Sequence, residues 1–112
     1  MADRYWVGGS GTWSSTTKWS ATSGGASGAS VPTTADNVIF DANSDAGLGA
    51  ITVTLTVAAN CLALNLSGID QDLTFTGAFA LNVYGNFTMS GTQTVDCTGL
   101  ASSQISLHIV TG

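Results

Sequence analysis

The 112-residue chain contains no glutamate, and it has only one lysine, one arginine and one histidine. Exposed helix faces are usually covered by glutamate, lysine and arginine, so their scarcity argues against surface helices. Lys18 and Arg4 offer too little positive charge to neutralise a nucleic-acid backbone or to hold an anionic membrane surface. We therefore expect neither nucleic acid nor a membrane as a partner.

Cysteine and long apolar runs are scarce as well. Cys61 and Cys97 permit one disulfide but no disulfide framework, and we expect both thiols to stay reduced. No apolar run reaches the roughly 18 residues of a membrane span, and the N-terminus lacks the apolar core and cleavage site of a secretory signal. The expectation is a chain made and folded in a cytoplasm. The alternative is a piece of an exported protein whose signal lies upstream.

Serine, threonine and glycine are abundant, at 13, 16 and 14 residues, while 44% of the chain is hydrophobic. From residue 36 onward the apolar residues alternate with Thr, Asn and Ser in short segments separated by glycines. A period of two places successive side chains on opposite faces of a strand. The predicted inward positions are Val38 and Phe40; Ile51, Val53, Leu55 and Val57; Leu62, Leu64 and Leu66; Leu73 and Phe75; Leu81 and Val83; Phe87 and Met89; Val95 and Cys97; Ile105, Leu107 and Ile109.

This pattern predicts an all-β fold, and two architectures accommodate it. We favour a short right-handed parallel β-helix, because Asn-Gly and Asp-Gly hairpin signals are absent and the outward positions suit ladders of like side chains. An antiparallel β-sandwich is the alternative. In the favoured fold, residues 1–35 form an N-terminal cap and a connecting loop, and residues 36–112 form the β-helical repeats.

The most distinctive segment is Arg4-Tyr5-Trp6-Val7-Gly8-Gly9-Ser10-Gly11-Thr12-Trp13, continued by Lys18-Trp19-Ser20. Together with Val31-Pro32 and residues 35–41, it resembles the N-terminal region of repetitive β-helical surface proteins of tailed phages and of autotransporter-like bacterial adhesins. The resemblance implies a β-solenoid on the outside of a virion or cell, and it implies no catalytic residue or cofactor.

We expect from this resemblance a non-catalytic structural protein on the surface of a tailed-phage virion, assembled in the host cytoplasm. It would be a capsid decoration or cement protein, or a fibre or tail appendage, and its partners would be other virion proteins. The alternative is an extracellular adhesin module that binds a host surface or glycan. An enzyme on a β-helix would need clustered carboxylates in a groove, whereas Asp70 and Asp72 alternate at a strand edge and are typical of solubilising charges.

Both ends of the predicted solenoid need cover, because a solenoid end exposes unpaired strand groups and apolar core. We predict that Tyr5, Trp6, Trp13 and Trp19 form the N-terminal cap; a surface platform for a sugar is the alternative interpretation of these rings. No polar cap follows the last apolar segment. We therefore expect self-association through an assembly end formed by Ile105, Leu107 and Ile109, and the resemblance to β-helical appendages implies a trimer as the first choice.

Two further features contain residue types that bind metals, but a metal site is the preferred interpretation of neither. Asp41, Asn43 and Asp45 resemble the front of an EF-hand loop and are a calcium candidate, but the glycine comes one place late and Thr52 stands where a closing glutamate belongs. An Asx-rich turn is the preferred interpretation. His108 lacks the partners for a zinc site, and we expect it on the outer side of the last strand, exposed or at an interface.

Overall fold

The computed structural model describes residues 2–77, 79–88, 95–100 and 105–107, and within them the chain is nearly all strand. This confirms the all-β prediction. A 3₁₀ helix, η1 (Thr16–Lys18), interrupts the strands, and no helix in the described part is long and apolar enough to cross a membrane. The strands are β1 (Asp3–Trp6), β2 (Gly11–Thr12), β3 (Trp19–Ser20), β4 (Asn37–Ile39), β5 (Ile51–Leu55), β6 (Ala59–Cys61), β7 (Leu64–Asn65), β8 (Leu73–Gly77), β9 (Leu81–Val83), β10 (Phe87–Thr88), β11 (Val95–Leu100) and β12 (Ile105–Leu107).

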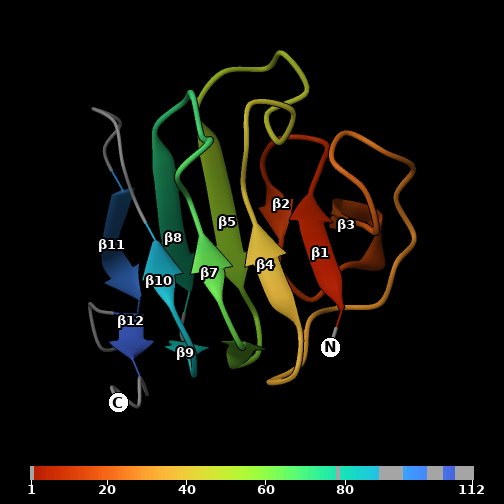
Figure 1. The fold of residues 1–112 in the computed structure, drawn as a ribbon. Coiled ribbons are helices and arrows are strands. Elements are labelled where there is room, and N and C mark those ends of the chain that lie inside the picture. Colours follow the sequence, from red (N-terminus) through yellow and green to blue (C-terminus); the bar gives the residue numbers. More distant parts are fainter. Residues whose placement is uncertain (1, 78, 89–94, 101–104, 108–112) are drawn as a thin grey trace.

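The strands form three sheets, named here A, B and C. Sheet A has the order β10-β7-β4-β1-β3, sheet B the order β11-β8-β5-β2, and sheet C the order β12-β9-β6. Apart from β3, every strand pairs in parallel with the strand three places along the chain, so the polypeptide visits the sheets in turn (Figure 1). A β-sandwich needs hairpins, and among the described residues no two consecutive strands are paired with each other.

In sheet B the step from one strand to its neighbour starts at 22 residues. Ile51 lies opposite Leu73 and Leu73 lies opposite Val95; the register of β11 then shifts between Asp96 and Gly99. Residues paired in register across a parallel ladder point to the same face of the sheet. Like side chains consequently stand side by side, as Thr52 and Thr74 do in sheet B. In sheet C, Asn82 Nδ2 donates to Asn60 Oδ1 over 3.2 Å.

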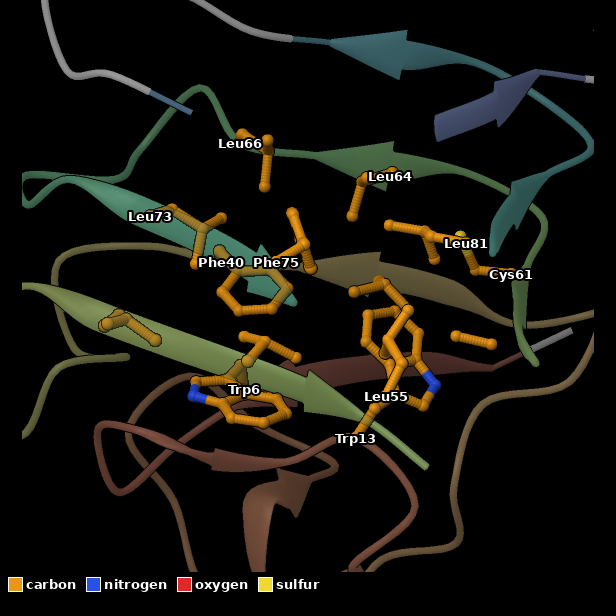
Figure 2. Close-up of a cluster of buried hydrophobic side chains, with 14 of the residues drawn as sticks. Trp6, Trp13, Phe40, Leu55, Cys61, Leu64, Leu66, Leu73, Phe75 and Leu81 are labelled. Carbon is orange, nitrogen blue, oxygen red and sulfur yellow. The ribbon is translucent and has the colours of Figure 1, made fainter. Parts of the chain in front are cut away.

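The core lies between the three sheets, with side chains converging from strands far apart in the sequence (Figure 2). Alternation predicted the inward residues of β5, β8 and β9 correctly, since the apolar side chains of these strands are buried and the residues between them are not. The buried apolar residues are Trp6, Val7, Trp13, Trp19, Val38, Phe40, Ile51, Val53, Leu55, Ala59, Cys61, Leu64, Leu66, Ile69, Leu73, Phe75, Leu81 and Val83.

Two predicted inward positions are wrong, and both lie where the chain leaves a strand. Val57 is 51% exposed, because the chain turns away from sheet B after Leu55. Leu62 is only half-buried, whereas Cys61 is fully buried. The corner between β6 and β7 places two successive residues, Leu62 and Ala63, outside, so the period of two restarts one residue later.

Several predicted inward positions have no described side chain. Met89 and Ile109 lie outside the described residues. Val95, Cys97, Ile105 and Leu107 lie on described strands, and only their backbone is placed. Phe87 is half-buried and packs against the core.

The N-terminal segment 1–35 contributes strands to the same sheets as well as a long loop. β1 pairs with β4 in sheet A, and β2 pairs with β5 in sheet B. β3 then returns antiparallel to β1, with Trp6 opposite Trp19. In the loop that comes after β3, Ala29 and Val31 pack against the core.

Candidate functional site

The three tryptophans lie inside the molecule, in one cluster with two phenylalanines. Trp6 stacks on Phe40 with ring centroids 5.4 Å apart, and Trp19 meets Trp6 and Trp13 edge-to-face at 5.1 and 4.8 Å. Phe75 contacts both Phe40 and Trp13. The indoles are at most 1% exposed, so none of them presents a ring on which a sugar could stack.

The indole N–H groups of the cluster differ in their partners. Trp6 Nε1 donates to the Gly9 carbonyl and Trp19 Nε1 to the Trp13 carbonyl, each over 2.7 Å. Trp13 Nε1 is buried without a hydrogen-bond partner among the described residues. A buried donor without a partner carries a desolvation penalty that no hydrogen bond offsets.

Tyr5, predicted to belong with the tryptophans, lies on the other face of its strand. It is half-buried, and it follows the alternation that turns its neighbour Trp6 inward. Its strand partner is Ile39 in β4. The phenol therefore belongs to the outer surface of sheet A.

The calcium candidate forms a set of hydrogen-bonded turns. Asp41 Oδ1 accepts from the Asn43 backbone N–H, and Asp45 Oδ1 accepts from that of Gly47. The other Asp41 oxygen accepts from the Ser23 hydroxyl, which ties this segment to the loop after β3. No group of three or more acidic, histidine or cysteine side chains that could hold a metal occurs in the described part of the chain. These contacts are those of Asx turns.

A hollow of about 490 Å³ lies between this segment and the loop after β3. Asp45 lines it and is only 6% exposed, while Gly8 and Gly24 form part of the opposite wall. Lys18 Nζ donates to the Gly8 carbonyl at 2.8 Å. The backbone at Gly8 and Gly24 has positive φ, so small side chains and turn geometry shape this hollow.

A larger hollow, of about 650 Å³, lies on the outer face of sheet A, and we name it the sheet A hollow. It extends across β1, β4, β7 and the start of β10. Ala63 and Gly85 create the space, because small residues stand there between longer neighbours. A Cβ atom at Gly85 would lie 2.8 Å from the Leu62 carbonyl oxygen, so this position accepts only glycine.

Polar groups line the sheet A hollow and keep free hydrogen-bonding capacity. Asn37 Nδ2 donates to Asp3 Oδ1 at 3.0 Å, and Asn65 Oδ1 accepts from both the backbone and the hydroxyl of Ser67. The Asn65 amide nitrogen and the side chains of Tyr5 and Asn86 have no hydrogen-bond partner within the described ranges.

The charge of the sheet A hollow comes from a single carboxylate, that of Asp3. Arg4 is the neighbour of Asp3 in β1, but its guanidinium is directed at the other side, where it donates to the carbonyl and the hydroxyl of Ser30 at 2.9 and 2.8 Å. Among the described residues, no cationic side chain lines the hollow.

Cys61 lines neither hollow. Burial raises the pKa of the Cys61 thiol to about 12, so the thiol stays protonated at neutral pH. Ile105 and Leu107 are in β12, opposite Leu81 and Val83, while Ile109 and His108 lie outside the described residues.

The sheet A hollow was not predicted from the sequence. Its signal was two small residues, Ala63 and Gly85, among outward positions that otherwise carry larger polar or apolar side chains. The two small residues come from the segments that lead into β7 and β10, which are neighbours in sheet A.

Comparison of the chain with protein-family models, with curated proteins and with solved structures finds no match. The sequence and the geometry are therefore the grounds on which a function can be proposed.

Proposed function

We propose that the chain is a short parallel β-helix that acts as a non-catalytic structural protein on the surface of a tailed-phage virion. In this fold each turn of the chain, or rung, contributes one strand to each sheet. The observation that carries the proposal is that strands other than β3 pair in parallel with the third strand along the chain, in sheets A, B and C alike.

The regular register supports a mechanical role. Rungs stacked through parallel ladders satisfy the backbone of each strand on both sides, and the stacked apolar side chains form a continuous core. Such a unit is stiff, and it presents flat outer faces of short polar side chains. In sheet B, Thr52 and Thr54 stand opposite Thr74 and Thr76. We infer that these faces make contacts with neighbouring proteins.

A non-catalytic role agrees with the placement of the acidic residues. Asp70 and Asp72 lie on the connection between β7 and β8, and they line neither of the two hollows described above. Asp36 and Asp41 accept hydrogen bonds that hold turns together. Carboxylates used in this way stabilise loops rather than activate a water molecule.

Self-association is the first test of this proposal. We propose a trimer that assembles through the last rung, where β11 and β12 contribute the outermost described strands of sheets B and C. Light scattering on the purified chain at micromolar concentration is expected to give three times the mass of one chain. A mass equal to one chain over the whole concentration range would contradict self-assembly.

The location is tested with an antibody raised against the purified chain. Gold-labelled antibody is expected to decorate phage particles that carry this protein when they are viewed by electron microscopy. Labelling of intact bacterial cells, with no label on the phage particles, would overturn the virion location and favour the adhesin alternative. Pre-incubating the antibody with purified chain provides the control.

A further inference from the structure

We propose that the sheet A hollow binds a short stretch of a neutral oligosaccharide. The proposal goes beyond the structural role and rests only on the outer face of sheet A. It does not depend on the particle or cell surface that carries the protein.

The size of the hollow suits a small polar ligand. Its volume of about 650 Å³ lies in the range of sites that bind small molecules. It crosses four neighbouring strands, which at ordinary strand spacing extend over roughly 14 Å. A single monosaccharide would leave much of this length empty, so the hollow is matched to consecutive units of a sugar chain.

The hydrogen-bonding groups of the hollow match the hydroxyls of a sugar. Neighbouring sugar hydroxyls both donate and accept, and a carboxamide offers one acceptor and two donors side by side. The side-chain nitrogen of Asn37 donates to Asp3, so its oxygen is available to a ligand. The side-chain oxygen of Asn65 accepts from Ser67, so its nitrogen is available. Asn86 adds a third carboxamide. The hollow can therefore accept from one hydroxyl and donate to the next.

Apolar groups stand beside these amides. Tyr5, Ile39 and Leu62 all line the hollow, and each is half-buried. The C–H face of a pyranose packs well on an aromatic or aliphatic surface, and tyrosine adds a hydroxyl at its edge. An aromatic ring flanked by amides is the combination that recognises a sugar by both its apolar face and its hydroxyls.

Charge and backbone pairing exclude the other ligand classes. Asp3 makes the hollow negative and neither Lys18 nor Arg4 lines it, so acidic sugars and nucleic acids are repelled. An extended peptide binds by adding a strand to a sheet edge, whereas this hollow lies on the face of sheet A, mostly over β1, β4 and β7, which are paired on both sides; only β10 is an outermost described strand. A neutral oligosaccharide is the class that remains.

Nuclear magnetic resonance titration of the whole, ¹⁵N-labelled chain tests the proposal. The probes are neutral hexasaccharides of β-1,4-glucose, α-1,4-glucose, α-1,6-mannose and β-1,4-N-acetylglucosamine, with a hexamer of galacturonic acid as the acidic counterpart. At least one neutral probe is expected to shift the side-chain amide signals of Asn37, Asn65 and Asn86. The acidic hexamer is expected to leave these signals unchanged.

Two variants locate the binding site. Ala63→Gln fills the hollow with a side chain that points away from the core, and Tyr5→Ala removes the aromatic surface. Each is expected to weaken binding at least about tenfold. Thr52→Gln, a matched change on the exposed outer face of sheet B, is expected to leave the affinity unchanged. Because the amide spectrum also reports folding, a variant that fails to fold is recognised and the other variant decides.

Three outcomes would overturn the proposal. One is that no neutral hexasaccharide shifts the sheet A amides at millimolar concentration. Another is that the acidic hexamer binds as well as the neutral ones. The third is that Ala63→Gln and Tyr5→Ala, when folded, bind as tightly as Thr52→Gln. None of these results bears on self-association or on virion location, which are measured separately.

Discussion

The three tryptophans are all buried, but their indole N–H groups are not equivalent. All three indoles lose the same volume when replaced by phenylalanine, so a comparison among them isolates the hydrogen bond. Trp6 and Trp19 each donate to a backbone carbonyl, and Trp13 has no such partner among the described residues. The unpartnered N–H of Trp13 costs stability in the native protein.

The three Trp→Phe variants should therefore separate in a urea unfolding experiment. We expect Trp13→Phe to lose about 1 to 3 kcal/mol less stability than Trp6→Phe or Trp19→Phe, because the latter two leave a carbonyl without its donor. The two tryptophans that remain in each variant supply the fluorescence signal. Equal losses for the three variants would show that Trp13 Nε1 has a partner in solution, such as a bound water molecule.

A strand end in sheet B gives the clearest test at the scale of the element. Gly77 ends β8 with a φ of +126°, and a Cβ atom there would overlap the carbonyl oxygen of Leu55 and lie 2.8 Å from the Leu55 nitrogen. Gly47 has a φ of +75°, and no atom lies within 4 Å of the corresponding Cβ position. An alanine substitution at each glycine therefore separates the free-energy cost of a positive φ from the free-energy cost of steric overlap.

Gly47→Ala should cost about 1 to 2 kcal/mol, the ordinary penalty for an L-residue at positive φ. Gly77→Ala should cost at least about 2 kcal/mol more, because the backbone of β5 has to move away from β8. Equilibrium unfolding by circular dichroism measures both values. If the two variants proved equally stable, β5 and β8 would not be in the close contact described.

The turn before β4 should make stability depend on pH. Burial alone would raise the pKa of Asp36, but hydrogen bonds from Thr33 and from the Ala2 backbone N–H, together with the charge of Arg4, hold this pKa below its ordinary value. A carboxylate with a lowered pKa in the folded state contributes stability that is fully present above its unfolded pKa of about 3.9. That contribution is lost as the pH falls through the folded pKa.

Asp36→Asn should therefore reduce stability at pH 7 and make it less sensitive to acid. We expect the stability difference between wild type and variant to shrink as the pH falls below about 4. The matched control is Asp70→Asn, a change at an exposed aspartate that forms no hydrogen bond with another described residue. A difference that stayed constant from pH 7 to pH 2 would contradict a role for the Asp36 carboxylate.

The sequence predicted strands well and predicted their ends poorly. Alternation identified the buried residues of β5 and β8 because these strands are long enough for the period of two to repeat. It failed at Val57 and at Leu62, because a corner inserts residues that belong to no strand. The sheet A hollow was missed for another reason: it results from residues of four strands, and no local pattern brings Ala63 and Gly85 together.

At the scale of the whole molecule, the 22-residue step predicts which deletions the protein tolerates. Removing residues 62–83 deletes β7, β8 and β9 and joins β6 to β10. If the chain is a stack of rungs, the remaining strands keep their inward and outward faces and β4 pairs with β10. We expect this variant to fold with a lower Tm, since each rung adds its own interface energy.

Removal of residues 54–74 is the control, because it deletes one residue fewer and joins Val53 directly to Phe75 inside a strand, so that two inward side chains become neighbours and the alternation of that strand is broken. We expect this variant to give neither a β-sheet spectrum nor a cooperative thermal transition. Circular dichroism between 5 and about 90 °C compares the two, over a range that covers ordinary domains. A shorter deletion that folded as well as the longer one would rule out fixed rungs.

The antiparallel strand β3 makes one side of sheet A different from the other. Every other described strand that borders β1 or β4 in sheet A runs the same way along the stack, and a second molecule could extend that stack only with a parallel strand. On that side of β1, backbone groups already pair with β3, a short strand that runs in the opposite direction. A second molecule at this side of sheet A would meet β3 and not β1, so the parallel ladder of sheet A cannot be continued in register there.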